Sequence, residues 1–163
     1  MTTGKQAHLE SARSLKSEFL AALDGMNYCL DWKQDPAEWS ARETAYHILE
    51  TPPGGVHALV TGILSGEIRE YDLWSDLTNV TPERSEYDMD QVIADIDALF
   101  QGLDEALSGC SDEDLETKTA MMHQKTREVD EERTINTILE RTLGAHIPEH
   151  LVQLRELRNA LGL

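Results

Sequence analysis

Apolar residues recur at steps of three and four along four segments of this chain, the spacing that places side chains on one face of an α-helix. These segments run from about Ala7 to Leu30, from Ser40 to Leu64, from Asp88 to Gly109 and from Thr134 to Leu161. The third segment has the most regular apolar stripe. We therefore predict four amphipathic helices.

The second segment carries both a helix start and an interruption. Ser40 is followed three residues later by Glu43, which is typical of a capping box, in which each side chain bonds a free backbone N–H. The Pro-Pro-Gly-Gly sequence at 52–55 predicts a kink or a break, because proline removes a donor and clashes with the preceding turn. A helical pattern then resumes over residues 56–64.

Two stretches of the chain lack helical periodicity. Residues 65–87 indicate a long ordered connection between the second and third helices, of a length that often covers a site. Residues 112–132 fit either an irregular loop or a short hairpin. Because four helices accompany so little strand signal, we predict an all-α fold, a four-helix bundle that forms a single domain over residues 1–163.

The net charge of the chain excludes some classes of binding partner. Fourteen lysines and arginines oppose 31 aspartates and glutamates, for a net charge of −17 at pH 7. Such a field repels nucleic-acid phosphates and anionic lipids, so we expect neither nucleic acid nor a membrane as partner. In addition, no run approaches the roughly 20 apolar residues of a membrane-spanning helix.

Cysteine use and the N-terminus favour a reducing compartment. Cys29 and Cys110 are the only cysteines, and neither has a metal-ligand spacing. A disulfide between them is one alternative, but free thiols are the simpler expectation. Residues 1–6 show no secretory signal. We therefore expect a cytoplasmic protein.

Histidines carry the main chemical signal. His146 and His150 lie four residues apart, so on a continuous helix both project from one face and can reach one metal ion. By itself the spacing also fits exposed or hydrogen-bonded histidines. Pro148 lies between them and predicts either a kinked continuous helix or a new helix that begins at the proline. We favour the continuous helix, because the apolar spacing keeps its register across Pro148.

A third histidine strengthens the metal hypothesis. His47 borders the apolar face of the second helix, where a bundle would place it opposite the pair. We expect the remaining histidines, His8, His57 and His123, to be structural or exposed, and of these three only His57 is placed where it could approach the site. A di-iron carboxylate site is rejected, because it requires Glu-x-x-His motifs and no predicted helix contains one.

These residues together resemble the DinB/YfiT-like superfamily of metal-binding four-helix bundles. One match is Trp-Ser-Ala-Arg-Glu-Thr-Ala-Tyr-His at 39–47, and the other joins Thr-Ile-Asn-Thr-Ile-Leu at 134–139 to His-Ile-Pro-Glu-His-Leu-Val-Gln at 146–153. The helix order and the length also fit, so the resemblance covers nearly the whole chain. The prolines at 52–53 and 148 depart from the usual pattern without removing a ligand.

The resemblance implies one divalent metal ion held by His47, His146 and His150, with zinc the first choice and nickel or iron as alternatives. It implies a metal-dependent hydrolase or a low-molecular-weight-thiol S-transferase, with a small-molecule substrate and a homodimer among its assemblies. The metal would lower the pKa of a bound water or bind a thiol as thiolate. The competing class is a non-enzymatic, stress-related binding or dimerisation module whose metal is structural or absent.

Two carboxylates are candidates for the general base. Glu50 follows His47 by three residues, and Glu149 follows His146 by three. Either could orient a ligand or accept a proton. The alternative is that both are surface carboxylates in an acidic chain.

Overall fold

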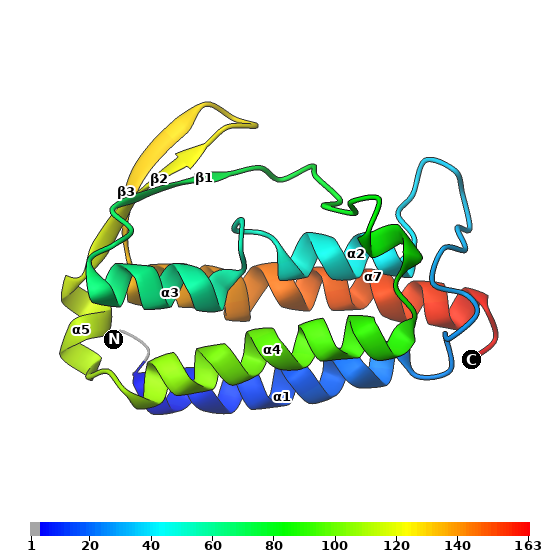
Figure 1. The fold of residues 1–163 in the computed structure, drawn as a ribbon, viewed down its shortest axis with the longest axis horizontal. Helices are drawn as coiled ribbons and strands as arrows, with labels where there is room; N and C mark the ends of the chain where they lie inside the picture. Colours follow the sequence, from blue (N-terminus) through cyan, green and yellow to red (C-terminus); the bar gives the residue numbers. More distant parts are fainter. Residues whose placement is uncertain (1–3) are drawn as a thin grey trace.

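The computed structural model describes residues 4–163 (Figure 1). In chain order the elements are α1 (Lys5–Leu23), α2 (Ala41–Leu49), α3 (Val56–Ser65), β1 (Glu70–Leu73), the 3₁₀ turn η1 (Arg84–Glu86), α4 (Met89–Ser108), α5 (Asp112–Thr117), β2 (Thr119–Gln124), β3 (Val129–Thr134), α6 (Ile135–Arg141), the π-helical turn η2 (Thr142–His146) and α7 (Ile147–Ala160). No helix among the described residues is long and apolar enough to cross a membrane. Cys29 and Cys110 are both free thiols.

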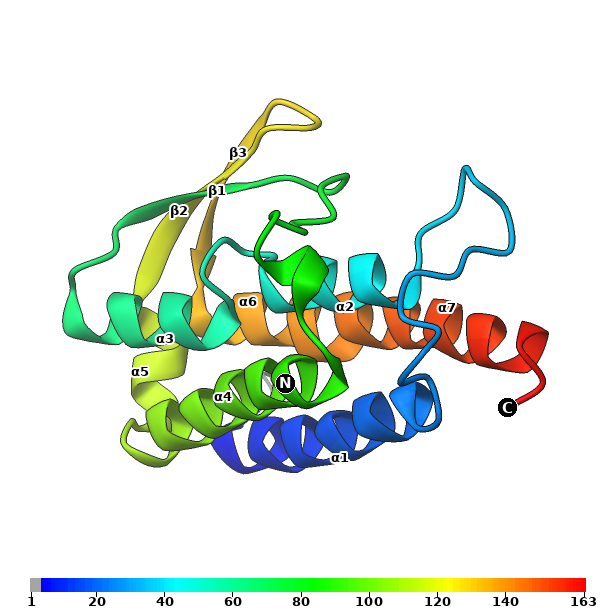
Figure 2. The ribbon, with the colours of Figure 1, turned by 45° about the vertical axis from the view of Figure 1, so that its right-hand side comes forward.

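The long helices pack as two adjoining layers. Helices α1 and α4 lie side by side, α2 and α3 follow one another end to end, and α6, η2 and α7 form one long helical stretch (Figures 1 and 2). The interior between them is filled by the apolar stripes of these helices, for example Phe19 of α1, Ile96 and Leu103 of α4 and Leu151 of α7, each at most 1 % exposed. Burial of these stripes is the main stabilising contribution to the helical layers.

The second predicted helix is divided as its sequence indicated. Ser40 and Glu43 form both bonds of the capping box at the start of α2. Gly54 and Gly55 adopt φ values of +83° and +91°, which residues with a Cβ rarely adopt, and so they form the break between α2 and α3. The break leaves His47 in the last turn of α2.

The helical stretch across Pro148 is continuous but not uniformly α-helical. Residues 142–146 form a π turn, in which the N–H of Ile147 donates to the carbonyl of Thr142, five residues back. This wider turn directly precedes Pro148, which therefore lies in the first turn of α7, where a missing N–H is tolerated. The helical backbone thus continues through the histidine pair, as in the kinked continuous helix that we favoured, and the π turn is an addition to that prediction.

The prediction of an all-α four-helix bundle is wrong, because the structure contains a three-stranded mixed sheet in the order β1-β2-β3. Strand β1 pairs in parallel with β2, with Tyr71 opposite Met122, and β2 pairs antiparallel with β3, with Ala120 opposite Arg133. The sheet lies over the end of the molecule formed by α3 and α6 (Figures 1 and 2). Residues 112–132 are thus a short helix and most of a hairpin, which was one of the two alternatives for this stretch.

The connection between α3 and α4 is ordered and is anchored on α2. Besides strand β1 it contains η1, and the buried guanidinium of Arg42 donates to the carbonyls of Arg84 and Tyr87. Arg84 in turn donates to the carbonyl of Asn79 and to Glu50. These bonds fix residues 77–87 against the end of α2 that carries His47.

Candidate metal centre

The structure brings His47, His146 and His150 together. Each offers an imidazole nitrogen, and these three nitrogens all lie within 4.8 Å of one another. Nε2 of His47 lies 3.0 Å from Nε2 of His146, and the ring of His150 lies 4.6 and 4.7 Å, centroid to centroid, from the two others. His47 comes from the last turn of α2, His146 from the π turn and His150 from α7, so two separate parts of the chain supply the cluster.

Outer partners orient two of the three rings. Nδ1 of His47 lies 2.6 Å from the backbone carbonyl of Leu77, and Nδ1 of His150 lies 2.8 Å from Oε1 of Gln153. Because both oxygens only accept, each Nδ1 carries the proton and donates it, which leaves the Nε2 lone pair free. Carbonyl partners of this kind fix the tautomer of metal-ligating histidines. In the cluster as it stands, Nε2 of His47 accepts from Nε2–H of His146.

The surroundings keep the imidazoles of His146 and His47 neutral. Burial, together with the neighbouring His150 and His47, lowers the pKa of His146 to about 3. Burial also lowers the pKa of His47, and the Leu77 carbonyl opposes this shift only in part. Neutral imidazole is the form that binds metal ions, so His47 and His146 can bind a metal at neutral pH without first losing a charge.

The donor set fits a divalent transition metal. Three neutral nitrogens suit zinc, nickel or iron, and with Zn–N bonds near 2.0–2.1 Å a tetrahedral site separates its nitrogens by about 3.3 Å. The His47–His146 separation of 3.0 Å is close to this value, and the other pairs lie within 4.8 Å. Small rotations of the rings therefore suffice to surround an ion. Trp39 packs against the cluster, with its ring 4.7 Å from that of His47 and stacked on that of His150 at 6.1 Å.

The two candidate carboxylates have different positions. Glu50 is the C-cap of α2 and is already engaged, because it accepts from Arg84 at 2.8 Å and from the N–H of Gly54 at 3.0 Å. Glu149 is exposed and lines a pocket together with His146. Of the two, only Glu149 faces a space that a substrate can enter. The catalytic role itself stays a prediction.

The three other histidines lie outside the cluster. His8 is buried and bonds Asn136 at 2.7 Å, so it is structural although it lies near the N-terminus. His123 lies on β2 and pairs with Asp130 at 2.7 Å. His57 packs against Gly102 of α4, where a Cβ would lie 2.8 Å from its ring. His57 therefore lies outside the site, as expected of a structural histidine, because its side chain turns toward α4.

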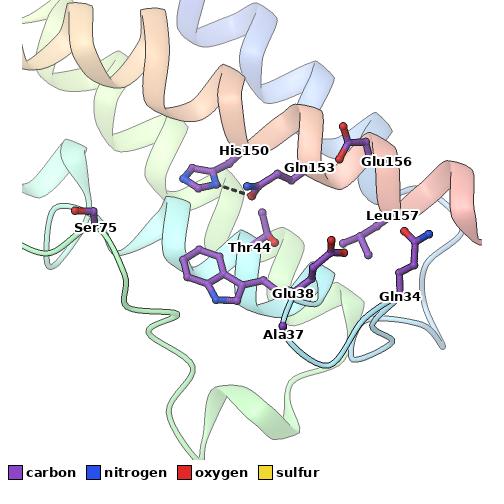
Figure 3. Close-up of a pocket in the computed structure, with 10 residues that line it drawn as sticks. Gln34, Ala37, Glu38, Thr44, Ser75, His150, Gln153, Glu156 and Leu157 are labelled. Atoms are coloured by element: carbon purple, nitrogen blue, oxygen red, sulfur yellow. Dashed lines mark hydrogen bonds between the residues drawn. The ribbon is translucent and has the colours of Figure 1, made fainter.

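One pocket adjoins the cluster at His150. It has a volume of about 480 Å³ and is lined by the loop before α2, by Thr44, by Ser75 and by the middle of α7 (Figure 3). Figure 3 shows His150 bonded to Gln153 on α7, with Glu38 on the loop opposite. The ionised groups of this lining are the carboxylates Glu38 and Glu156. We call this cavity the loop pocket.

A second pocket adjoins the cluster at His146. Its volume is about 430 Å³, and it lies between the inner face of the sheet and the α6–η2–α7 stretch. Its lining holds three arginines and a single carboxylate, namely Arg127, Arg133, Arg141 and Glu149. We call this cavity the sheet pocket. Ser75 lines both pockets, while His146 lines only the sheet pocket and His150 only the loop pocket.

The sheet pocket was not predictable from local sequence patterns. Arg133 is 7 % exposed at the inward position of β3, where alternating patterns normally place an apolar residue. The outer partners Leu77 and Gln153 were also missed, because Leu77 contributes only a backbone carbonyl. The Gln153 contact was in principle detectable, since Gln153 follows His150 by three residues on one helix.

Comparisons with known proteins extend to the fold alone. No protein-family model matches the chain, and no curated protein is similar to it in sequence. A crystal structure of a protein from Streptococcus pneumoniae is similar, with a TM-score of 0.64 and 12 % sequence identity over 98 % of this chain and 92 % of that chain. The likeness covers nearly the full length of both chains, so the combination of helices and sheet described above is an arrangement that another protein also adopts.

Proposed function

We propose that this protein binds one divalent metal ion, with zinc the first choice, through the Nε2 atoms of His47, His146 and His150. The main observation behind this proposal is that three imidazoles from two parts of the chain converge on one point. The hydrogen bonds from His47 to Leu77 and from His150 to Gln153 support it, because they present the free lone pairs toward one another.

We further propose that the bound metal serves an enzyme, either a hydrolase or a low-molecular-weight-thiol S-transferase, as the resemblance to the DinB/YfiT-like superfamily implies. Three protein ligands leave a coordination position open, as in catalytic rather than structural zinc sites. When bound, the ion would supply Lewis-acid activation of water or of a thiol. The two pockets support this reading, because each reaches the cluster at a different histidine.

Residues of the chain take distinct parts in this proposal. Glu149 lies one turn from His146 along the same helical stretch and faces the sheet pocket, so it is the candidate for moving a proton. Trp39 packs against His47 and His150 and, together with His150, lines the loop pocket. Glu50 forms an ion pair with Arg84, which also donates to the carbonyl of Asn79. These contacts anchor the connection between α3 and α4, to which Leu77 belongs.

Elemental analysis after loading with zinc, nickel or iron tests the metal site. We expect about one ion per chain in the wild type. In His47→Ala the metal affinity should fall by more than the roughly 10- to 100-fold that is typical of losing an outer-shell partner, so this variant should retain little metal. His123→Ala, an imidazole on β2 outside the cluster, is the matched control and should leave the metal content unchanged. Wild-type protein that retains none of the three metals would refute the site. An esterase and thiol-transfer screen of the loaded protein then tests the activity.

The non-enzymatic module is a second candidate because of one observation. The His47–His146 hydrogen bond of 3.0 Å satisfies the cluster without any metal. If this reading holds, the three histidines act as a polar core that joins α2 to the α6–α7 stretch. His146→Ala would then lower the free energy of unfolding of metal-free protein by about 1–3 kcal/mol, the cost of leaving a buried partner unpaired, while wild-type protein would bind no metal.

A further inference from the structure

The sheet pocket has a local charge opposite to that of the whole molecule. The chain has a net charge of −17, yet this cavity is lined by three arginines and one carboxylate. A cluster of arginines attracts oxyanions, and the planar guanidinium donates to carboxylate or phosphate oxygens in pairs. Within an acidic protein such a cluster also gives an anion a defined place to bind, because most of the remaining surface repels it.

Arg133 is the central group of this cavity. Its side chain is 8 % exposed, and its Nε has no hydrogen-bond partner among the described residues. The nearest carboxylate oxygen, Oε1 of Glu131, lies 3.6 Å from that Nε, too far for a hydrogen bond, and Nη2 of Arg141 also approaches Oε1, at 3.4 Å. A buried donor without an acceptor is costly, and a bound ligand that supplies the acceptor removes that cost.

The elements around Arg133 fix it in place. Arg133 lies opposite Ala120 in the β2–β3 ladder, and Tyr71 of β1 lies opposite Met122, so both point to the inner face of the sheet. Burial raises the pKa of Tyr71, which keeps its hydroxyl protonated at neutral pH. Arg127, in the hairpin turn, and Arg141, at the end of α6, line the opening of the cavity.

We propose that the sheet pocket binds an oxyanion group of a small molecule, a carboxylate or a phosphate, through Arg133 with Arg141 and Arg127. Anion binding needs only the arginines, whereas identifying the bound molecule as the substrate rests on the proposed function. His146 and Glu149 line the same cavity, so a small molecule anchored by its oxyanion extends toward the histidine cluster. The site therefore selects acidic small molecules.

Titration of metal-free protein with inorganic phosphate and with succinate tests this proposal. Metal-free protein is required because a bound metal would itself attract these anions. Trp74 lines the cavity, so its fluorescence reports occupancy. We expect a saturable change with at least one of the two anions at constant ionic strength, and none with chloride. The change should vanish in Trp74→Phe and persist in Trp32→Phe, which alters a tryptophan outside the cavity. The anion that saturates at the lower concentration identifies which of the two chemistries the pocket prefers.

Arginine variants decide which residues bind. Arg133→Gln should weaken binding at least about tenfold. Because Arg133 is buried and this variant can fail to fold, Arg141→Gln provides the second measurement, with an expected loss of about threefold to tenfold. Arg155→Gln is its matched control, since both arginines are about half exposed and each pairs with one glutamate. Equal behaviour of Arg141→Gln and Arg155→Gln, or no saturation by either anion, would overturn the proposal.

The failure of this proposal is distinguishable from that of the proposed function. Protein that binds zinc but neither anion retains the metal centre and loses the oxyanion site. Protein that binds an anion but no zinc keeps the oxyanion site and refutes the metal centre. Zinc content of Arg141→Gln should equal that of the wild type, because Arg141 does not belong to the histidine cluster.

Discussion

The sheet pocket and the loop pocket border the same three histidines but differ in charge and in construction. Three arginines line the first, whereas the ionised groups in the lining of the second are Glu38 and Glu156. The sheet pocket is built by strands and by the π turn, and the loop pocket by a loop and by regular α-helix. If the oxyanion proposal holds, a small molecule that lies across the histidine cluster would direct its anionic end to the sheet pocket and a neutral or cationic end to the loop pocket.

Reversing the charge of the sheet pocket has the largest expected effect. Arg133→Glu places a carboxylate at a nearly fully buried position beside Glu131, so we expect the free energy of unfolding to fall by about 3 kcal/mol or more. Arg155→Glu on the exposed face of α7 should change it by about 1 kcal/mol or less. Urea denaturation of the two variants measures both values. Similar losses would mean that the buried arginine has no special electrostatic role.

The π turn beside the sheet pocket, which has no counterpart among the described residues beside the loop pocket, can be tested by a deletion. A π turn holds one residue more than an α turn, so deletion of Gly144 should convert residues 142–146 to α-helix. Pro148 would then clash with the carbonyl four residues back, with an expected loss of up to about 3 kcal/mol in unfolding free energy. Adding Pro148→Ala to the deletion should restore most of it.

Gly144→Ala serves as the control for this deletion. A Cβ at this position meets no atom within 4 Å, so the substitution should stabilise the helix by about 0.5–1 kcal/mol. In the full-length chain, Pro148→Ala alone should leave the free energy of unfolding unchanged or raise it. It should also weaken zinc binding, because without the proline residues 142–146 no longer need a π turn, and His146 would be presented at a different angle. A deletion variant with wild-type stability would show that Pro148 does not require the π turn.

Removing an outer partner on the loop side should have a smaller effect. Gln153→Met deletes the acceptor for Nδ1 of His150 while it keeps the length of the side chain. Zinc affinity should fall about 10- to 100-fold, as measured by competition with a chromophoric chelator. Gln101→Met on α4, whose side chain bonds only Glu105 among the described residues, is the matched control. An unchanged affinity in Gln153→Met would remove Gln153 from the metal centre.

Acidification of metal-free protein gives the smallest effect per step. The pKa of His146 is about 3 in the folded protein and near 6.5 in the unfolded chain, and the pKa of His47 is also lowered. The unfolded chain therefore binds more protons in this window, and stability is lost as the pH falls from 6.5 toward 3. The slope is at most about 1.4 kcal/mol per pH unit for each histidine.

Two variants separate these contributions in urea melts at pH 6 and pH 5. His146→Gln should flatten the loss of stability between the two values. His123→Gln, the control, should leave the loss between the two values nearly unchanged, because the bond to Asp130 raises the pKa of His123. That raised pKa gives stability which is present below pH 6.5 and is lost as the pH rises through the raised value. An identical pH dependence in wild type and His146→Gln would contradict the neutral, buried state of His146.

The sequence by itself determined the long helices and the identity of the three clustered histidines, but not the end of α1, which lies at Leu23 instead of Leu30, nor the short helix α5. Helical periodicity is a local property, so the stripes in α1, α4 and α7 were visible without knowledge of their neighbours, and the capping box at Ser40 fixed the start of α2. The spacing of His146 and His150 on one helix face is equally local. The position of His47 followed because an amphipathic helix turns that residue toward the interior.

Tertiary structure alone decided the sheet, the π turn and the charge of the two pockets. The sheet pairs residues 70–73 with residues 121–124, which are far apart in the chain. Its inner face carries Arg133 at a position where an apolar residue would have completed the alternating pattern of a strand. The partners of the histidines depend on where the long connection folds back, since the Leu77 carbonyl has no sequence signature. Long-range strand pairing and backbone acceptors produce no periodic pattern in a sequence. These features nevertheless determine which groups surround the three histidines and how the two adjoining pockets differ in charge.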